Sequence, residues 1–271
     1  AADYGPVFWT TDDDGSTLEL AAIKADAEKI AAGETATIAK YTRWMNADHR
    51  FNVKWYDQGI AEADNPTKAT VYDVRIIGLN HDDKSDGSGK AGITFQFVNV
   101  LKDLYPMNGS DTSNGGFPGS QLGKKLYFSG SIGSQAPLML KQGIVQVDKA
   151  CRQGTASLGQ TNVQARQFFL IAHAEMVEVP HPDWEGLWAA GIAPEASGIY
   201  AYYAPMHIAG NRSYPALLKT PQGSSTPVRW WQRTPSPGIK TSYVAVRSDT
   251  GAPVEDVTAT SVIGVCPSFC L

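Results

Sequence analysis

The C-terminal segment from Val228 to Leu271 constrains the fold more strongly than any other part of the sequence. Runs of aromatic and β-branched residues predict three short strands there, at Arg229–Arg233, Ser242–Arg247 and Ile263–Leu271. Loops of small and polar residues separate these strands. We therefore expect hydrophobic strands that are fixed in a core and hold up the loops between them.

The composition of the whole chain predicts a loop-rich protein with a true core. Its 271 residues suffice for one large domain or two ordinary ones, and 42% of them are apolar, which is normal for a globular protein. Twenty-six glycines and sixteen prolines indicate many turns. Seven Trp, eleven Tyr and nine Phe residues supply large anchoring side chains. A helical bundle is not expected.

The clearest helix is predicted from Ser16 to Ala32. Ser16 and Glu19 have the spacing of a capping box, and Gly33 supplies a stop signal. Apolar residues recur with helical period at Leu20, Ile23, Ala27 and Ile30. We expect this stripe to pack against the body of the protein.

The aromatic residues that follow this helix show no clean period. They stand among polar residues, at Trp44, Phe51, Trp55 and Tyr56. This pattern predicts an irregular segment. We therefore divide the chain into an N-terminal helix and irregular segment at residues 1–69, packed on the body, and a main domain at residues 70–271.

Further elements are predicted in the middle of the chain. Two paired strands, Val71–Leu79 and Gly92–Leu101, are joined by the polar loop HDDKSDGSGK. The stretch GSQLGKKLYF predicts a short helix with Leu122 and Leu126 facing inward. A helical turn and two strands follow, at Pro137–Gln142, Ile144–Val147 and Gln167–Met176. The region from there to Pro227 is too long for an ordinary loop, which makes it a candidate functional excursion or a set of packed loops.

The charge balance argues against nucleic-acid and membrane partners. The net charge is −4, so the chain has no basic stripe that would neutralise phosphates or anionic lipids. No stretch approaches the roughly 20 apolar residues that span a bilayer, and membrane insertion is not expected. The first residues also lack the basic and apolar segments of a secretion signal.

Three cysteines, Cys151, Cys266 and Cys270, have no metal-binding spacing. On an extended strand Cys266 and Cys270 would lie about 13 Å apart, at about 3.3 Å per residue, whereas a disulfide tolerates a Cα separation of about 7 Å. A direct bridge would need a sharp bend, which Pro267 permits. We expect three buried thiols that pack as small hydrophobic side chains.

The loop between the two central strands carries Asp82, Asp83 and Asp86. Carboxylate oxygens of this kind bind calcium, but the loop lacks the full EF-hand pattern and its terminal bidentate Glu. We favour a solvated turn, with calcium binding as the alternative. No metal-binding residue is predicted.

No local catalytic motif is visible. The sequence has no nucleophile elbow, zinc-protease helix, phosphate-binding loop or dinucleotide-binding motif. The five histidines are scattered, at His49, His81, His173, His181 and His207. His173 follows an apolar run and is predicted to be a packed or capping residue rather than a ligand. A fold can bring distant residues together, so the expectation of a protein without enzymatic activity or cofactor depends on their final positions.

Several motifs resemble those of one protein family. WWQRTP at Trp230–Pro235, YVAVRSDTG at Tyr243–Gly251 and GVCPSFCL at Gly264–Leu271 resemble the endings of a C-type-lectin-fold domain common in phage and gut-bacterial proteins. DDKSDGSGKAGITF, MNGSDTSNGGFPGSQLGKKL and FFLIAHAEM look like earlier motifs of that family, so the resemblance covers about Thr70 to Leu271. The family is similar to the variable proteins made by diversity-generating retroelements.

The resemblance implies an α+β, C-type-lectin-like fold with short twisted antiparallel sheets, two or more helices and abundant loops. In such proteins the aromatic and arginine residues of the first motif build the scaffold, which implies structural roles for Trp230, Trp231 and Arg233. Residues in the loops that follow contact the ligand. The implied ligand-face positions in this chain are Ser236, Ile239, Lys240, Ser242, Tyr243, Val254, Glu255, Asp256, Thr258 and Thr260.

The resemblance also implies a biological role. It predicts a non-enzymatic receptor-binding protein, encoded by a phage or prophage, that is located in the virion at the phage tail, or outside the cell or on its surface. Its partner would be a host cell-surface protein or glycan. Phage fibre proteins of this type are often trimers, so a homo-trimer is one expected assembly. A structural virion or surface-display component that uses the fold for assembly is the alternative.

An enzyme of the formylglycine-generating type is a further alternative, because it shares this fold and uses a cysteine pair with copper. Cys266 and Cys270 would have to serve, and the strand separation given above argues against one metal between them. The EPN and WND signatures with which C-type lectins proper hold calcium and sugar do not occur. Calcium-dependent sugar binding is therefore not implied.

Overall fold

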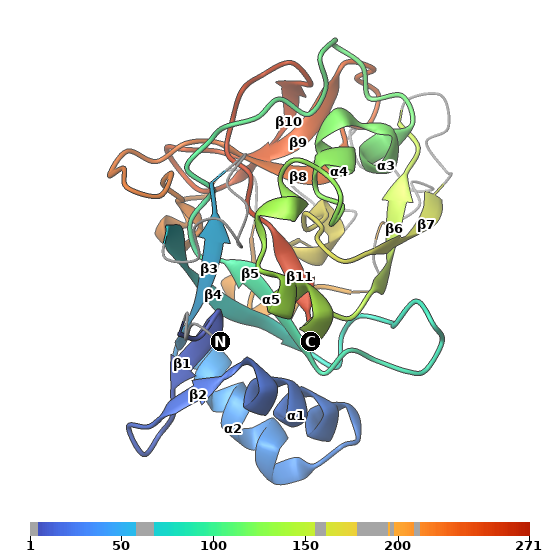
Figure 1. Ribbon diagram of the computed structural model, residues 1–271. Coiled ribbons are helices and arrows are strands. Elements are labelled where there is room, and N and C mark those ends of the chain that lie inside the picture. Colours follow the sequence, from blue (N-terminus) through green and yellow to red (C-terminus); the bar gives the residue numbers. More distant parts are fainter. Residues whose placement is uncertain (1–4, 58–67, 155–160, 178–194, 196–197, 209–211) are drawn as a thin grey trace.

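The computed structural model describes residues 5–57, 68–154, 161–177, 195, 198–208 and 212–271, and at Glu255 the backbone only. Over these residues the protein is a mixed α and β structure whose named strands all pair antiparallel (Figure 1). This confirms the α+β class expected from the sequence. No helix within the described ranges is long and apolar enough to cross a membrane.

The largest sheet contains segments from both ends of the chain. Its strands are β1 (Phe8–Thr11), β2 (Thr17–Glu19), β3 (Arg50–Tyr56), β4 (Ala69–Leu79), β5 (Ile93–Phe97) and β11 (Ser268–Cys270). They follow the order β11-β5-β4-β3-β1-β2. The predicted pairing of the two central strands is confirmed, since Leu79 lies opposite Ile93. On the other side of β5, Phe95 lies opposite Phe269.

The first helix, α1, spans Leu20–Ala31 and begins four residues later than predicted. The start was misplaced because the residues before it form β2, which pairs with β1 instead of capping the helix. Glu19 is the N-cap, without a side-chain capping bond. The predicted apolar stripe is confirmed, because its four members are buried: Leu20, Ile23, Ala27 and Ile30.

The prediction of an irregular segment after α1 is wrong. A second helix, α2 (Thr35–Asn46), is followed directly by β3. Within β3 the buried Phe51, Val53 and Trp55 alternate with less buried residues, which is the period of a strand with one face on a core. β3 pairs with β4 along its whole length, so the sheet crosses the boundary drawn at residues 69 and 70.

Two smaller sheets and three short helices form the rest of the body. The three-stranded sheet has the order β10-β9-β8, and β6 pairs with β7 in a hairpin. These strands are β6 (Val147–Arg152), β7 (Thr161–Arg166), β8 (Trp230–Pro235), β9 (Ser242–Val246) and β10 (Pro253–Thr258). The helices are α3 (Gly116–Gly119), α4 (Gln121–Lys125) and α5 (Leu138–Gly143). The predicted short helix with buried Leu122 and Leu126 and the predicted helical turn are both confirmed.

Three predicted strands are corrected. The one expected at Ile263–Leu271 is confined to β11. The segment Gln167–Met176 makes a single strand-like bridge, from Phe169 to Ser268, and then a 3-10 turn at His173–Glu175. The apolar residues of this segment are buried. Their strand-like composition therefore results from packing in the core and not from pairing with a neighbouring strand. The strand expected at Ile144–Val147 begins only at its last residue. Further 3-10 turns lie at Gly133–Gln135, Ala204–Met206 and Pro215–Leu217. Of the expected excursion, residues 178–194, 196–197 and 209–211 lie outside the described residues.

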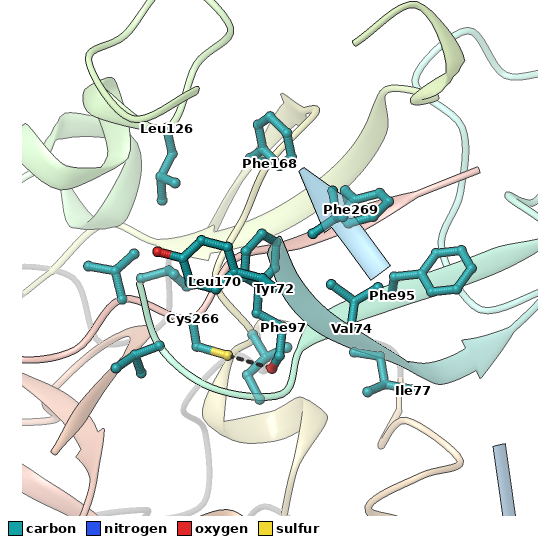
Figure 2. Close-up of a cluster of buried hydrophobic side chains, with 14 of the residues drawn as sticks. Tyr72, Val74, Ile77, Phe95, Phe97, Leu126, Phe168, Leu170, Cys266 and Phe269 are labelled. Carbon is teal, nitrogen blue, oxygen red and sulfur yellow. Dashed lines mark hydrogen bonds between the residues drawn. The ribbon is translucent and has the colours of Figure 1, made fainter. Parts of the chain in front are cut away.

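The main hydrophobic core runs through the described part of the molecule, and a small second cluster lies around Phe169. Figure 2 shows Phe97, Phe168 and Phe269 in this cluster, from segments that are far apart in the sequence. The ring of Trp55 packs edge-on against Phe97 and Phe168, with centroids 5.3 and 5.2 Å away. Strand β3 therefore shares its core with the C-terminal half of the chain.

Candidate functional site

Loops that are far apart in the sequence meet at one end of the three-stranded sheet. Ser113 N–H donates to Lys240 O at 2.9 Å, which joins the loop before α3 to the β8–β9 loop. Ala259, which follows β10, donates to Thr241 O at 2.9 Å and accepts from Asn108 N–H at 2.9 Å. We call the exposed side of residues 108–115, 236–241 and 256–262 the terminal loop face. Figure 1 shows this sheet at the opposite end of the molecule from α1 and α2.

The structure divides the ten positions that the resemblance assigned to a ligand face. Four are exposed, and these are Lys240, Asp256, Thr258 and Thr260. Ile239 and Val254 are half-buried. The side chain of Glu255 lies outside the described part. The remaining three, Ser236, Ser242 and Tyr243, are buried, with exposed fractions of 2%, 2% and 0%.

This burial corrects the expected surface position of Ser236, Ser242 and Tyr243. All five residues of β9 are buried, so both faces of this strand are covered and neither presents side chains to solvent. The Tyr243 ring packs edge-on against Trp231 with centroids 6.3 Å apart. Burial raises the pKa of its phenol well above the ordinary value. Ser236 N–H donates to Ser242 O at 2.9 Å, so the two serines close the hairpin.

The loop before α3 contributes exposed residues that the sequence did not assign to the site. Ser110, Asp111 and Asn114 are exposed. Asp111 Oδ1 accepts hydrogen bonds from the backbone N–H of Thr260 at 3.2 Å and from its hydroxyl at 2.5 Å, 149 positions along the chain. In the sequence this loop is a run of turn-forming polar residues within one of the family-like motifs, and such a run carries no information about its spatial neighbours.

The residues implied to be structural are buried beneath this face. Trp230 and Trp231 are 0% exposed, and their indole N–H groups donate to the carbonyls of Leu217 at 3.0 Å and Tyr105 at 2.9 Å. Each indole therefore ties a connecting segment to β8. Arg233 is also 0% exposed and enters a network of buried charges.

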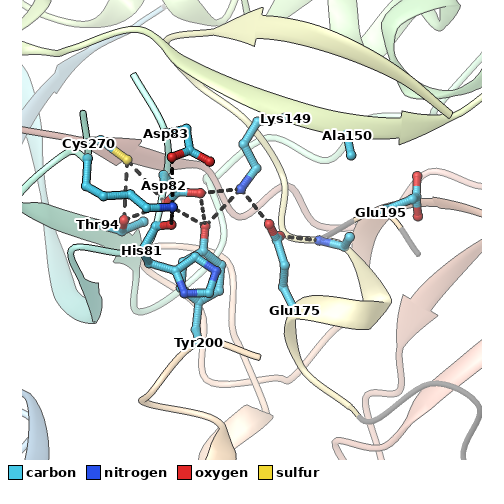
Figure 3. Close-up of polar contacts among 12 residues, drawn as sticks. His81, Asp82, Asp83, Thr94, Lys149, Ala150, Glu175, Glu195, Tyr200 and Cys270 are labelled. Carbon is cyan, nitrogen blue, oxygen red and sulfur yellow. Dashed lines mark hydrogen bonds and ion pairs between the residues drawn. The ribbon is translucent and has the colours of Figure 1, made fainter. Parts of the chain in front are cut away.

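That network joins five segments of the chain (Figure 3). Lys149 Nζ on β6 donates to Asp82 Oδ1 at 2.6 Å and to Glu175 Oε1 at 2.5 Å. Arg233 on β8 donates to both oxygens of Glu175, at 2.6 and 3.2 Å. The hydroxyl of Tyr200 accepts from Lys149 at 3.0 Å and contacts both oxygens of Asp82. Two positive and two negative charges thus compensate each other in the interior.

The structure corrects the expected character of the Asp-rich loop. Asp82 is 4% exposed and belongs to the buried network rather than to a solvated turn. Asp83 pairs with Lys90 at 2.8 Å near the surface, and Asp86 accepts from the backbone of Ser88 at 2.8 Å. The solvated turn is therefore confined to the part of the loop after Asp82.

One group of side chains has the composition of a metal site. Its possible ligand atoms, from His81, Asp82 and Glu175, lie within 4.8 Å of one another. The ammonium of Lys149 contacts both carboxylates and already supplies the cation. Burial acts to raise the pKa of Asp82, but Lys149 outweighs it and holds this pKa well below the usual range. Likewise, Arg233 and Lys149 overcome burial and lower the pKa of Glu175. A metal ion would have to displace the ammonium.

The predicted burial of the three cysteines is confirmed, and all three are free thiols. Cys266 donates to Phe97 O at 3.1 Å, whereas Cys270 contacts the Thr94 hydroxyl at 3.4 Å. The same region holds a buried lysine, Lys219, whose Nζ donates to the carbonyls of Phe97 at 3.0 Å and Val98 at 2.7 Å. Burial lowers the pKa of Lys219 to about 8.

The buried lysine predicts a pH dependence of stability. Between the folded pKa of about 8 and the ordinary lysine pKa of 10.5, the unfolded chain holds a proton that the folded chain has released. Raising the pH through this window therefore favours the folded state, by about 1.4 kcal/mol per pH unit. We expect the free energy of unfolding of the wild type, relative to Lys219→Met, to rise accordingly between pH 8 and 10 in urea titrations. Lys29→Met, which removes an exposed ammonium, is the control, and a flat difference for Lys219→Met would contradict the assignment.

Comparison with protein-family models, curated proteins and solved structures found no match. Two regions of the structure differ in the solvent exposure of their polar groups. The terminal loop face presents hydroxyl, carboxylate, amide and ammonium groups to solvent on a buried scaffold. The network around Lys149 consists of side chains with almost no exposure, so its chemistry acts within the protein rather than on a partner.

Proposed function

We propose that this protein is a non-enzymatic binding protein of the C-type-lectin-like type, which grips a host cell-surface protein or glycan through the terminal loop face. In this proposal it belongs to a phage tail or is displayed outside the cell, and its terminal segment is a target of diversification. The observation that supports the proposal is the meeting of segments 108–115, 236–241 and 256–262. Segments distant in sequence thus expose polar side chains side by side.

The scaffold beneath this face suits a surface whose residues change. Trp230, Trp231 and Arg233 are fully buried and tie β8 to the segments of Leu217, Tyr105 and Glu175, so the strands do not depend on the exposed loop side chains. Exposed substitutions of this kind usually change stability by less than about 0.5 kcal/mol. Binding specificity can therefore change while the fold is kept.

A binding screen against glycans and host cells tests the proposal. The triple variant Lys240→Ala, Asp256→Ala, Thr260→Ala removes exposed groups of the face, and we expect it to lose about 10-fold or more in affinity for the target that the wild type binds. Glu28→Ala with Lys29→Ala, exposed on α1 at the other end of the molecule, also removes one charge of each sign and should bind normally.

The outcomes separate binding from assembly. Equal binding of the face variant and the wild type to every target would reject the terminal loop face as the ligand site. If only self-association or incorporation into particles changes in the variant, the face serves assembly, as expected for a structural virion or display component. Light scattering of the purified proteins measures this second readout.

A further inference from the structure

A buried amine contacts two buried carboxylates in the interior of the protein (Figure 3). The Nζ of Lys149 lies 2.6 Å from Oδ1 of Asp82 and 2.5 Å from Oε1 of Glu175. The exposed fractions of these three side chains are 4%, 3% and 1%. A nucleophile, an acyl group and a carboxylate base are therefore held in contact and shielded from bulk water.

We propose that Lys149 and Asp82 become joined by an intramolecular isopeptide bond, which the folded chain forms by itself with Glu175 as the proton-transfer group. The product is an amide between Lys149 Nζ and Asp82 Cγ. The reaction is a condensation and requires no cofactor, metal or oxidant. It is independent of the proposed ligand binding, because none of the three residues belongs to the terminal loop face.

The hydrogen-bond partners assign different roles to the two carboxylates. Glu175 receives the guanidinium of Arg233 on both oxygens, which holds its negative charge in place. Apart from the amine, Asp82 receives hydrogen bonds from uncharged hydroxyl groups, those of Thr94 at 2.6 Å and Tyr200 at 2.9 and 3.1 Å. The Lys149 ammonium is the ion-pair partner of Asp82, so transfer of its proton to Asp82 removes both charges together. Asp82 is therefore the acyl group, and Glu175 is the base.

The surroundings favour condensation. The Nζ of Lys149 lies 4.5 Å from the centroid of the Phe169 ring. This ring belongs to a small apolar cluster with Ala91, Val147 and Cys270, all 0% exposed. In such a site the uncharged amide costs less to bury than the ion pair that it replaces, and little water is available to reverse the reaction. Contact between the reacting groups gives an effective concentration far above that in solution.

The atoms balance as one amide formed and one water released. A proton first moves from the Lys149 ammonium to Oδ1 of Asp82 along their hydrogen bond. The Nζ lone pair then attacks Cγ, while Thr94 and Tyr200 stabilise the charge that develops on Oδ2. Glu175 removes a proton from the attacking nitrogen and returns it to Oδ1, which leaves as water. One C–N bond forms, one C–O bond breaks, and no electron is gained or lost.

The bond would hold together two parts of the fold that are distant in sequence. It joins β6 to the segment after β4, across a separation of 67 positions. Amide formation removes one positive and one negative charge together. The remaining pair of Arg233 and Glu175 is therefore still neutral, and the buried region tolerates the product.

Intact-mass spectrometry of the full chain tests the proposal directly. We expect a mass that is lower than the sequence mass by one water molecule. A protease digest should contain one branched peptide that joins the segments carrying Lys149 and Asp82. A chain at its full sequence mass, or a water loss that maps to any other pair of residues, would overturn the proposal.

Two variants separate the roles of the residues. Lys149→Arg keeps the positive charge but replaces the amine by a guanidinium that stays protonated, so the variant should show its own full sequence mass. Glu175→Gln keeps the shape of the proton-transfer group and should slow bond formation by about 100-fold or more. The linked fraction is measured against time after refolding, with circular dichroism to establish the native fold. Equal rates for Glu175→Gln and the wild type would reject Glu175 as the proton-transfer group.

Discussion

Replacing Arg233 with methionine is expected to lower the free energy of unfolding by about 3–5 kcal/mol. Its guanidinium donates to both oxygens of Glu175 and to the carbonyls of Ala150, Leu170 and Glu195. Methionine fills a similar length but donates no hydrogen bond. A carboxylate that is 1% exposed would then lose its guanidinium partner. Urea unfolding followed by tryptophan fluorescence measures the loss.

A matched substitution at the surface gives the control for this prediction. Arg247 pairs with Asp249 at 3.0 Å, and its side chain is 41% exposed. Water replaces the lost partner there, so Arg247→Met should cost less than about 1 kcal/mol. Similar losses for the two arginine variants would show that the buried pair has no special importance for stability.

A double substitution tests the physical reason for the loss. If the cost arises from an uncompensated buried charge, removing the carboxylate as well should recover part of it. Arg233→Met with Glu175→Met is therefore expected to be more stable than Arg233→Met alone. The pair of Lys149 and Asp82 stays neutral in this variant, so no new charge is left without compensation.

The elements that could be predicted from the sequence are those with a local signal. The stripe of α1 repeats every three or four residues, and β4 and β5 are rich in β-branched residues on both sides of a polar loop. β3 was missed because its aromatic residues were treated as scattered, although Phe51, Val53 and Trp55 alternate. The Gln167–Met176 run has strand composition, but its neighbours leave it only a single bridge.

The candidate sites depend on contacts that no local pattern contains. Asp82 looked like part of a solvated turn because its partner Lys149 lies 67 positions away. Asp111 and Thr260 are 149 positions apart and still share a hydrogen bond. The strand that contains Tyr243 was predicted from the sequence. The burial of both faces of β9 was not, because a fully buried strand shows no alternation of apolar and polar residues.

Gly116→Ala is expected to lower the free energy of unfolding by about 3 kcal/mol or more. Gly116 has a φ of +61°, and a Cβ on it would lie 1.9 Å from the carbonyl oxygen of Arg152 on β6. The cost of backbone strain and the cost of displacing β6 therefore add up in the loss of stability. Gly87→Ala is the matched control, because its φ of +74° is similar and nothing lies within 4 Å of the added Cβ. It should lose about 1 kcal/mol.

The difference between the two glycine variants isolates the close approach of α3 to β6, and equal losses in urea unfolding would contradict it. This approach also positions the terminal loop face, because Gly116 directly follows the 108–115 loop and donates its N–H to Ser113 O at 3.0 Å. A Cβ that pushes α3 away from Arg152 moves this loop relative to Lys240. Gly116→Ala, measured under conditions where it is folded, should therefore bind the ligand proposed for the terminal loop face more weakly than Gly87→Ala does.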